Sequence, residues 1–97
     1  MQTENVVEET TKTCLPCKYK VIFHNDDITP MGFVVELLFG IFDMSRENAI
    51  TLMLEIHKNG SGVAGTYIKS IAESKVSLTR EVSIKANYPL TVTMERE

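Results

Sequence analysis

Three polar residues in a row, Asn25, Asp26 and Asp27, stand where an apolar run ends and a Thr-Pro pair begins, in the string FHNDDITPM. One amide and two carboxylates offer several hydrogen-bond acceptors and no permanent positive charge to neutralise them. We therefore expect this cluster to bind either backbone N–H groups or a cation. Bonds to the backbone would form an Asx turn ahead of a helix, which is a common role for such residues.

Two kinds of cation can be considered for this cluster. A calcium ion prefers about six to eight oxygen ligands, and the spacing of an EF-hand loop is absent, so the sequence disfavours a metal. An ammonium group fits better, because apolar side chains stand beside the acceptors at Met31 and Val34 and again at Met53 and Ile56. Methionine fills gaps in cores and also lines adaptable binding surfaces, so a core role and a binding role both remain open.

The two cysteines form the motif CLPC, from Cys14 to Cys17. Thiols at this spacing can exchange with disulfides, which makes a small thiol oxidoreductase the alternative in the enzyme class. A thioredoxin-type pair follows a strand and opens a helix, whereas this pair follows a Thr/Glu-rich segment and precedes a strand-like run. Zinc would need two further ligands, and only His24 and His57 could supply nitrogen. We therefore expect no enzyme activity, no metal and no cofactor.

Composition limits the class of protein further. A chain of 97 residues, 43% apolar and 24% charged, predicts one small domain without a large enclosed active site. The formal charge of -3 and the scattered Lys and Arg residues argue against nucleic acid or an anionic membrane as partner. The N-terminal stretch has no signal-peptide pattern, and Glu36 breaks the longest apolar run. We expect a cytoplasmic monomer that binds small molecules or proteins.

The chain divides into a tail and a core. Residues 1–17 are rich in Thr and Glu and show no sustained periodicity, which predicts a flexible tail. The core domain is predicted over residues 18–97. Its first element is a strand that ends near His24, with Tyr19, Val21 and Phe23 alternating onto one face.

Two helices are predicted after the polar cluster. Thr29 followed by Pro30 is typical of an N-cap and a first helical position, and the apolar spacing continues this helix to about Phe42. Ser45 can cap a second helix, which Gly60 ends. One face of the second helix is expected to carry Ala49, Ile50, Met53, Ile56 and His57.

A strand, a third helix and a last strand complete the prediction. The string GVAGTYI is typical of a short strand in which Gly65 weakens or bulges the pairing. Ser70 with Glu73 fits a capping box, and Asn87 can end this helix in a left-handed conformation. The string YPLTVTME alternates as a strand does. The order β-α-α-β-α-β predicts an α+β fold, a two-layer sandwich in which three helices cover one side of a three-stranded antiparallel sheet.

Three strings, NDDITPMGFVVELL, AITLMLEIHKNG and YPLTVTME, resemble at these separations the ClpS family of adaptors. Members of that family hand N-end-rule substrates to an ATP-dependent Clp unfoldase and protease. The resemblance covers about residues 18–97 and implies the fold derived above, which the family shares with the C-terminal domain of the ribosomal stalk protein. It implies two partners: N-degron substrates that begin with Leu, Phe, Tyr or Trp, and the N-terminal domain of a Clp AAA+ unfoldase.

The resemblance also implies residue roles. Asn25, Asp26 and His57 match the residues that bind the α-amino group of the substrate, His57 partly through water. Met31 matches the position that screens out β-branched side chains. The pocket for the first side chain is implied to be lined by Thr29, Met31, Val34, Leu37, Met53, Ile56 and Leu90.

Docking on the unfoldase is implied for the third helix. Lys75 matches a position that helps to dock the unfoldase, and Ser70 stands where an acidic residue is common in the family. A stalk-type domain that recruits other proteins through the same fold remains the alternative among binding proteins. Basic residues on a helix would favour that alternative, whereas the acidic cluster at Asp26 and Asp27 disfavours it.

Overall fold

Strands and helices follow one another in the predicted order β-α-α-β-α-β. The computed structural model describes residues 17–97. Its elements are β2 (Lys18–His24), α1 (Met31–Gly40), α2 (Arg46–Asn59), β3 (Ser61–Ile68), α3 (Lys69–Lys85) and β4 (Thr91–Arg96). The predicted tail, residues 1–17, lies outside the described residues except for Cys17, and so does Cys14.

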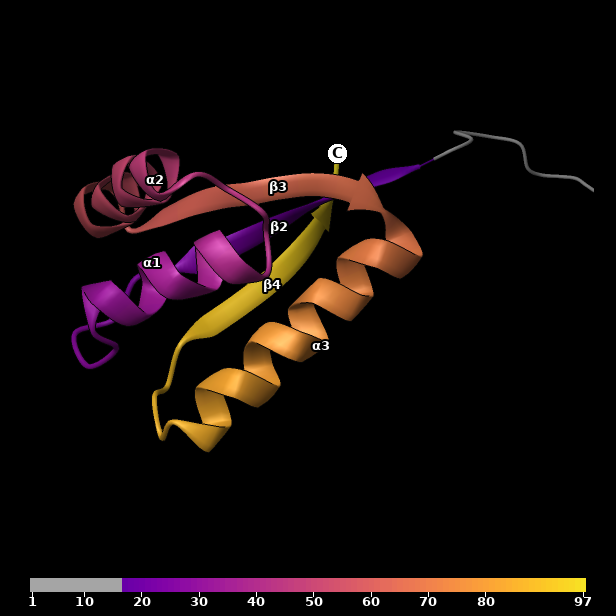
Figure 1. The fold of residues 1–97 in the computed structure, drawn as a ribbon. Helices are drawn as coiled ribbons and strands as arrows, with labels where there is room; N and C mark the ends of the chain where they lie inside the picture. Colours follow the sequence, from indigo (N-terminus) through magenta and orange to yellow (C-terminus); the bar gives the residue numbers. More distant parts are fainter. Residues whose placement is uncertain (1–16) are drawn as a thin grey trace, which may run out of the picture.

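The strands form one antiparallel three-stranded sheet in the order β3-β2-β4, with the first strand in the middle (Figure 1). Val21 of β2 pairs with Gly65 and Ile22 pairs with Val63, so the register shifts by one residue at this point. This shift confirms the predicted bulge, because an extra residue on one strand is what defines a bulge.

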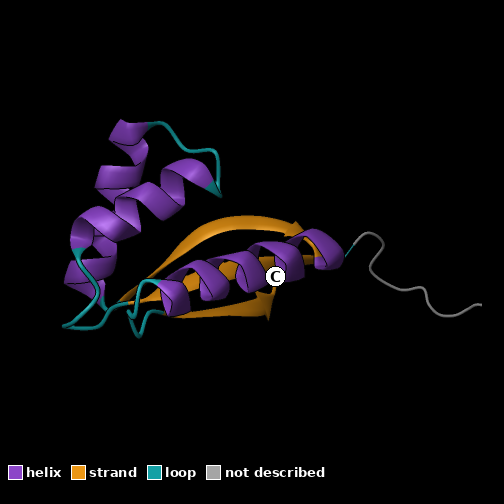
Figure 2. Cartoon of the chain, turned by 60° about the horizontal axis from the view of Figure 1, so that its bottom comes forward, coloured by secondary structure: helices purple, strands orange, loops and turns teal. Residues whose placement is uncertain are grey.

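The helices cover the face of the sheet that carries the alternating apolar residues. Helix α3 runs along the sheet beside β4, and α1 and α2 pack together near the end of β2 and the start of β3 (Figures 1 and 2). Val21, Phe23 and Val92 are completely buried beneath them. The ring of Phe23 meets the ring of Phe42 edge-on, with 5.4 Å between the centroids. The α+β sandwich is therefore confirmed, with its core between the sheet and the helices.

The first helix begins and ends within the predicted bounds. Pro30 is the N-cap and makes no side-chain capping bond, so the prediction that Thr29 caps this helix is wrong. The hydroxyl of Thr29 donates instead to the carboxylate of Asp26, 2.8 Å away. The helix ends at Gly40 rather than at Phe42, and the chain then turns through a left-handed residue at Asp43 (φ 56°).

The caps of α2 agree with the prediction, but its buried face is narrower. Ser45 accepts a hydrogen bond from the backbone of Asn48, and Gly60 ends the helix in the left-handed region at φ 93°. Ala49 and Ile56 are buried and Met53 is half-buried. The prediction that Ile50 and His57 share this inward face is wrong, since both are exposed.

Helix α3 follows β3 with no intervening loop. Its N-cap is Ile68 without a side-chain bond, so the predicted capping box that starts at Ser70 is wrong. Asn87 takes the expected left-handed conformation at φ 63°. The buried hydroxyls of Thr79 and Ser83 donate to backbone carbonyls one turn earlier, which satisfies these two polar groups in the core. None of the helices in residues 17–97 is long and apolar enough to cross a membrane.

Candidate functional site

The polar cluster lies at a corner where β2, α1 and α2 meet. The backbone N–H of Asn25 donates to the carbonyl of Gly60 over 2.9 Å. This bond ties the end of β2 to the end of α2, because Gly60 is the residue that terminates that helix. The cluster is therefore held between two helices rather than left on a free loop.

Asp26 organises the chain between β2 and α1. Its Oδ1 accepts hydrogen bonds from the backbone N–H groups of Ile28 (2.8 Å) and Thr29 (2.6 Å), and its Oδ2 accepts one from the Thr29 hydroxyl (2.8 Å). Partial burial acts to raise the pKa of Asp26, but the bonds from Thr29 and Ile28 outweigh it and lower the pKa below the ordinary value. The carboxylate is therefore charged at neutral pH, and one of its about four acceptor positions is not used by these bonds.

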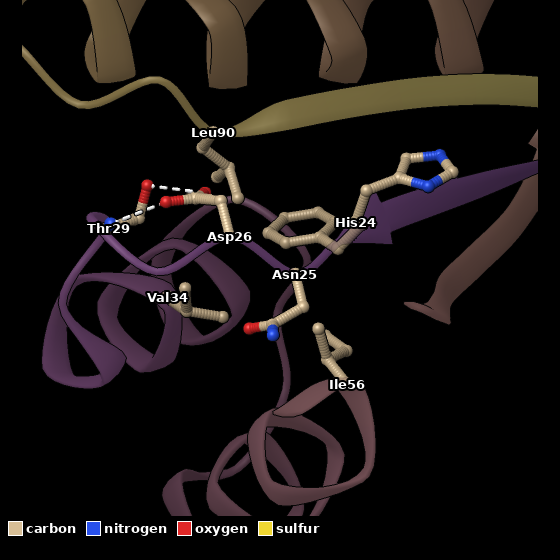
Figure 3. A pocket seen from close by; sticks show the side chains of 8 residues that line it. His24, Asn25, Asp26, Thr29, Val34, Ile56 and Leu90 are labelled. Atoms are coloured by element: carbon tan, nitrogen blue, oxygen red, sulfur yellow. Dashed lines mark hydrogen bonds between the residues drawn. The ribbon is translucent and has the colours of Figure 1, made fainter. Parts of the chain in front are cut away.

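A small pocket opens between these acceptors and apolar side chains. Figure 3 shows Val34 reaching it from α1, Ile56 from α2 and Leu90 from the segment before β4, with Asn25 and Asp26 between them. The cavity has a volume of about 20 Å³. Its full lining is Phe23, His24, Asn25, Asp26, Thr29, Val34, Ile56 and Leu90.

Four of the residues expected at the site do not line this cavity. Leu37 is buried in the core with 4% of its surface exposed, and Met53 is half-buried. Met31 lies on the first turn of α1 with 43% of its surface exposed. His57 follows Ile56 on the last turn of α2 and is exposed. Met31 and His57 are therefore surface residues, each on a helix that contributes to the lining.

Two lining residues, Phe23 and His24, were not expected there. The alternation of β2 places Phe23 inward immediately before the cluster, and this pattern could have identified it. The ring of His24 points away from the cavity in Figure 3, and its Nε2 lies 2.8 Å from the Thr93 hydroxyl on β4. His24 therefore contributes to the rim while its ring bonds across the sheet.

The two expected docking residues differ in their surroundings. Ser70 is exposed on the first turn of α3. The ammonium of Lys75 donates to the carbonyl of Ile41 over 2.6 Å and lies over the rings of Phe42 and Tyr67, at 5.5 and 5.2 Å from their centroids. Lys75 therefore fastens α3 to the end of α1.

Within residues 17–97 no three side chains of His, Cys, Asp or Glu lie close enough together to hold a metal ion. The pocket instead offers a fixed carboxylate, an amide and a short apolar wall, which suit a ligand with a positive end and an apolar end. Fold and pocket thus define the class: a small α+β binding domain with a surface pocket of mixed polarity.

Comparisons with known proteins identify the family. The family model described as "ATP-dependent Clp protease adaptor protein ClpS" matches residues 15–93. ClpS adapter proteins of Desulforapulum autotrophicum and of Campylobacter jejuni (strain RM1221) are 42% and 47% identical to this chain, over 99% and 92% of it and over 90% and 93% of their own lengths. The chain therefore belongs to the ClpS family, whose members are adaptors of the Clp protease.

A solved structure supports the same assignment. Agrobacterium tumefaciens ClpS2 bound to L-phenylalaninamide matches with a TM-score of 0.82 and 36% identity, over 84% of this chain and 99% of that one. The common fold extends over nearly the whole of that relative.

Proposed function

We propose that this protein binds the free N-terminal residue of other proteins, with preference for Leu, Phe, Tyr and Trp, and delivers them to a Clp AAA+ unfoldase. In this proposal the adaptor itself catalyses no reaction. The observation that carries it is the pocket in which Asp26 and Asn25 stand directly beside Val34, Ile56 and Leu90. An N-terminal residue has the matching shape, an ammonium next to an apolar side chain.

The solved relative supports this choice of ligand. L-phenylalaninamide, the molecule bound to ClpS2, has a free amino group, a benzyl side chain and an amide in place of a carboxylate. It therefore has the groups that the first residue of a polypeptide presents. An internal Phe lacks the free amino group, so it should not be recognised.

The amino group would bind at the polar side of the pocket. The unused acceptor position of Asp26 and the side chain of Asn25 would accept its hydrogens, and His57 on the exposed end of α2 would reach it through a water molecule. An α-amino group has a pKa of about 7.7 to 8.0, so it is mostly charged at neutral pH. Each charge-assisted bond contributes about 1.5 to 3 kcal/mol.

The side chain would bind at the apolar side. Burial of a Leu or Phe side chain contributes about 1.5 to 3 kcal/mol. This burial and two or three charged hydrogen bonds together, less the entropy lost on binding, give a binding free energy of about -8 kcal/mol. That free energy corresponds to a dissociation constant in the micromolar range. We assign Met31 and Met53 to the outer wall, where Met31 would collide with a side chain branched at Cβ, and Leu37 to the layer behind it.

Delivery would use the start of α3. We assign Ser70 to the contact with the N-terminal domain of the unfoldase because it is exposed, and Lys75 to holding that helix in place through Ile41. The protein is expected to act as a monomer in the cytoplasm.

One titration tests the proposal. A fluorescent peptide that begins with Phe is titrated with the protein, and the same peptide with an acetylated N-terminus serves as the matched control. We expect micromolar binding of the free peptide and no saturation with the acetylated one, because acetylation removes the charge and adds bulk at Asp26. Equal binding of the two peptides would refute recognition of a free N-terminus.

A further inference from the structure

The pocket as it stands is smaller than the side chains that the proposed function assigns to it, and the inference below rests on that function. Its volume of about 20 Å³ is enough for about one water molecule. A cavity that accepts a benzene ring has about 150 Å³. A wall must therefore move if a large first side chain is to enter this cavity completely.

Two of the apolar walls are held tightly by their neighbours. Phe23 is completely buried and packs edge-on against Phe42. Ile56 is 3% exposed, and its Cγ1 would lie only 2.8 Å from a Cβ placed on Gly62, which means that it packs closely on the backbone of β3. Close-packed interiors resist displacement, so moving either of these walls would require wider rearrangement of the core.

Leu90 is the wall with open space behind it. It lies in the connection between α3 and β4, immediately before Thr91 begins the strand. A second hollow of about 280 Å³ lies beyond it, and Leu90 is the residue that the two hollows have in common. The second hollow is lined by Arg80, Ser83, Ile84, Tyr88, Pro89, Leu90, Thr91 and Val92.

Hydrogen bonds fix the backbone on both sides of Leu90. The N–H of Tyr88 donates to the carbonyl of Ser83 over 2.9 Å, and the guanidinium of Arg80 donates to the carbonyl of Val92 over 3.0 Å. The backbone is therefore attached to α3 both before and after Leu90. The easiest movement left is rotation of the Leu90 side chain between staggered rotamers.

We propose that Leu90 is a movable wall, which a large first side chain pushes into the second hollow. Residues of that hollow, the buried Ser83 above all, then determine the largest side chain that is accepted although they do not touch the substrate. They affect specificity only by limiting how far the Leu90 side chain can move. A first residue of Leu needs less displacement than Phe, and Phe needs less than Trp.

Filling the second hollow tests this inference. Ser83→Leu places an isobutyl group behind Leu90, and Ser77→Leu makes the same change at an exposed position of the same helix. Dissociation constants are measured by fluorescence anisotropy for otherwise identical peptides that begin with Leu, Phe or Trp. We expect Ser83→Leu to weaken Trp relative to Leu by about tenfold, with Phe between them, and Ser77→Leu to leave the ratios unchanged.

The outcomes separate this inference from the proposed function. If the unaltered protein binds none of the three free peptides, the proposed function fails. If it binds them and Ser83→Leu leaves the ratio of Trp to Leu unchanged, the movable wall is refuted while the function stands.

A measurement on the unaltered chain covers the case in which Ser83→Leu does not fold. Methyl resonances of Leu90 and Ile84 are followed by carbon-13 NMR during the same titrations. We expect both to shift on binding of the Trp peptide, and Ile84 to shift less with the Leu peptide. An Ile84 methyl that does not respond to any peptide would overturn the proposal, because Ile84 lines only the second hollow of the two described above.

Discussion

Replacing Asp26 with Asn would remove a charge from the proposed amino site while keeping the shape of the corner. The amide oxygen can still accept from the backbone N–H groups of Ile28 and Thr29, which now lie 2.8 and 2.6 Å from Oδ1. The new NH₂ would face the Thr29 hydroxyl, which can accept as well as donate. The turn before α1 should therefore persist.

The expected loss of peptide affinity follows from the difference in free energy between charged and neutral hydrogen bonds. A bond to a charged group contributes about 1.5 to 3 kcal/mol, whereas a neutral bond contributes about 0.5 to 1.5. Losing the charge thus costs about 1.4 kcal/mol, which is a tenfold weaker affinity. The NH₂ group also points hydrogens at the ammonium, so tenfold is a lower bound.

Asp27→Asn is the matched control. It removes the same charge from the adjacent residue, which is exposed and does not line the pocket. Anisotropy titrations with a Phe-initiated peptide should show at least about a tenfold increase in dissociation constant for Asp26→Asn and less than about twofold for Asp27→Asn. If the two variants weaken binding equally, only the net charge matters, and the assignment of Asp26 to the ammonium is wrong. Urea denaturation would show whether both variants remain folded.

Four further predictions follow from the same geometry. Between pH 7 and pH 9 the affinity for a Phe-initiated peptide should fall by about tenfold as the amino group loses its proton, whereas an affinity that does not change with pH would contradict ammonium binding. The pKa of Asp26 is lowered on folding, so its contribution to stability is present above the unfolded pKa of about 3.9 and is lost as the pH falls through the folded pKa. The urea midpoints of the unaltered protein and of Asp26→Asn should therefore converge in acid. Lys75→Met should lower the free energy of unfolding by about 1 to 3 kcal/mol in urea denaturation, because it leaves the carbonyl of Ile41 without its bond; a change within error would mean that water replaces that donor. Met31→Ala should improve binding of an Ile-initiated peptide relative to its Leu twin, and an unchanged ratio would remove Met31 from the selection against branched side chains.

Local sequence was sufficient for the elements and for several of their ends. Alternation of Tyr19, Val21 and Phe23 predicted a strand with one buried face, because successive side chains of a strand point to opposite sides. Ser45 and Gly60 marked the ends of α2 through a side-chain acceptor and a left-handed backbone. These signals depend on groups within a few residues of one another, so no knowledge of the rest of the fold is needed.

Contacts made or not made with other residues explain where the local predictions were wrong. The hydroxyl of Thr29 is bound by the carboxylate of Asp26 and therefore does not cap α1. Ile50 and His57 have the spacing of an inward face, but spacing alone does not say how much of that face another element will cover. In the structure α2 packs mainly on α1 and β3, and both residues remain exposed.

By itself the sequence determined the order of strands and helices, the acidic cluster and, through three strings that resemble ClpS, the family. The tertiary structure decided the strand order β3-β2-β4 and the meeting of Asp26 with Val34, Ile56 and Leu90. It also decided that this meeting leaves a small pocket with a second hollow behind one wall. The reason is physical: backbone preferences act over a few residues, whereas the distance between remote side chains is set by how whole elements pack.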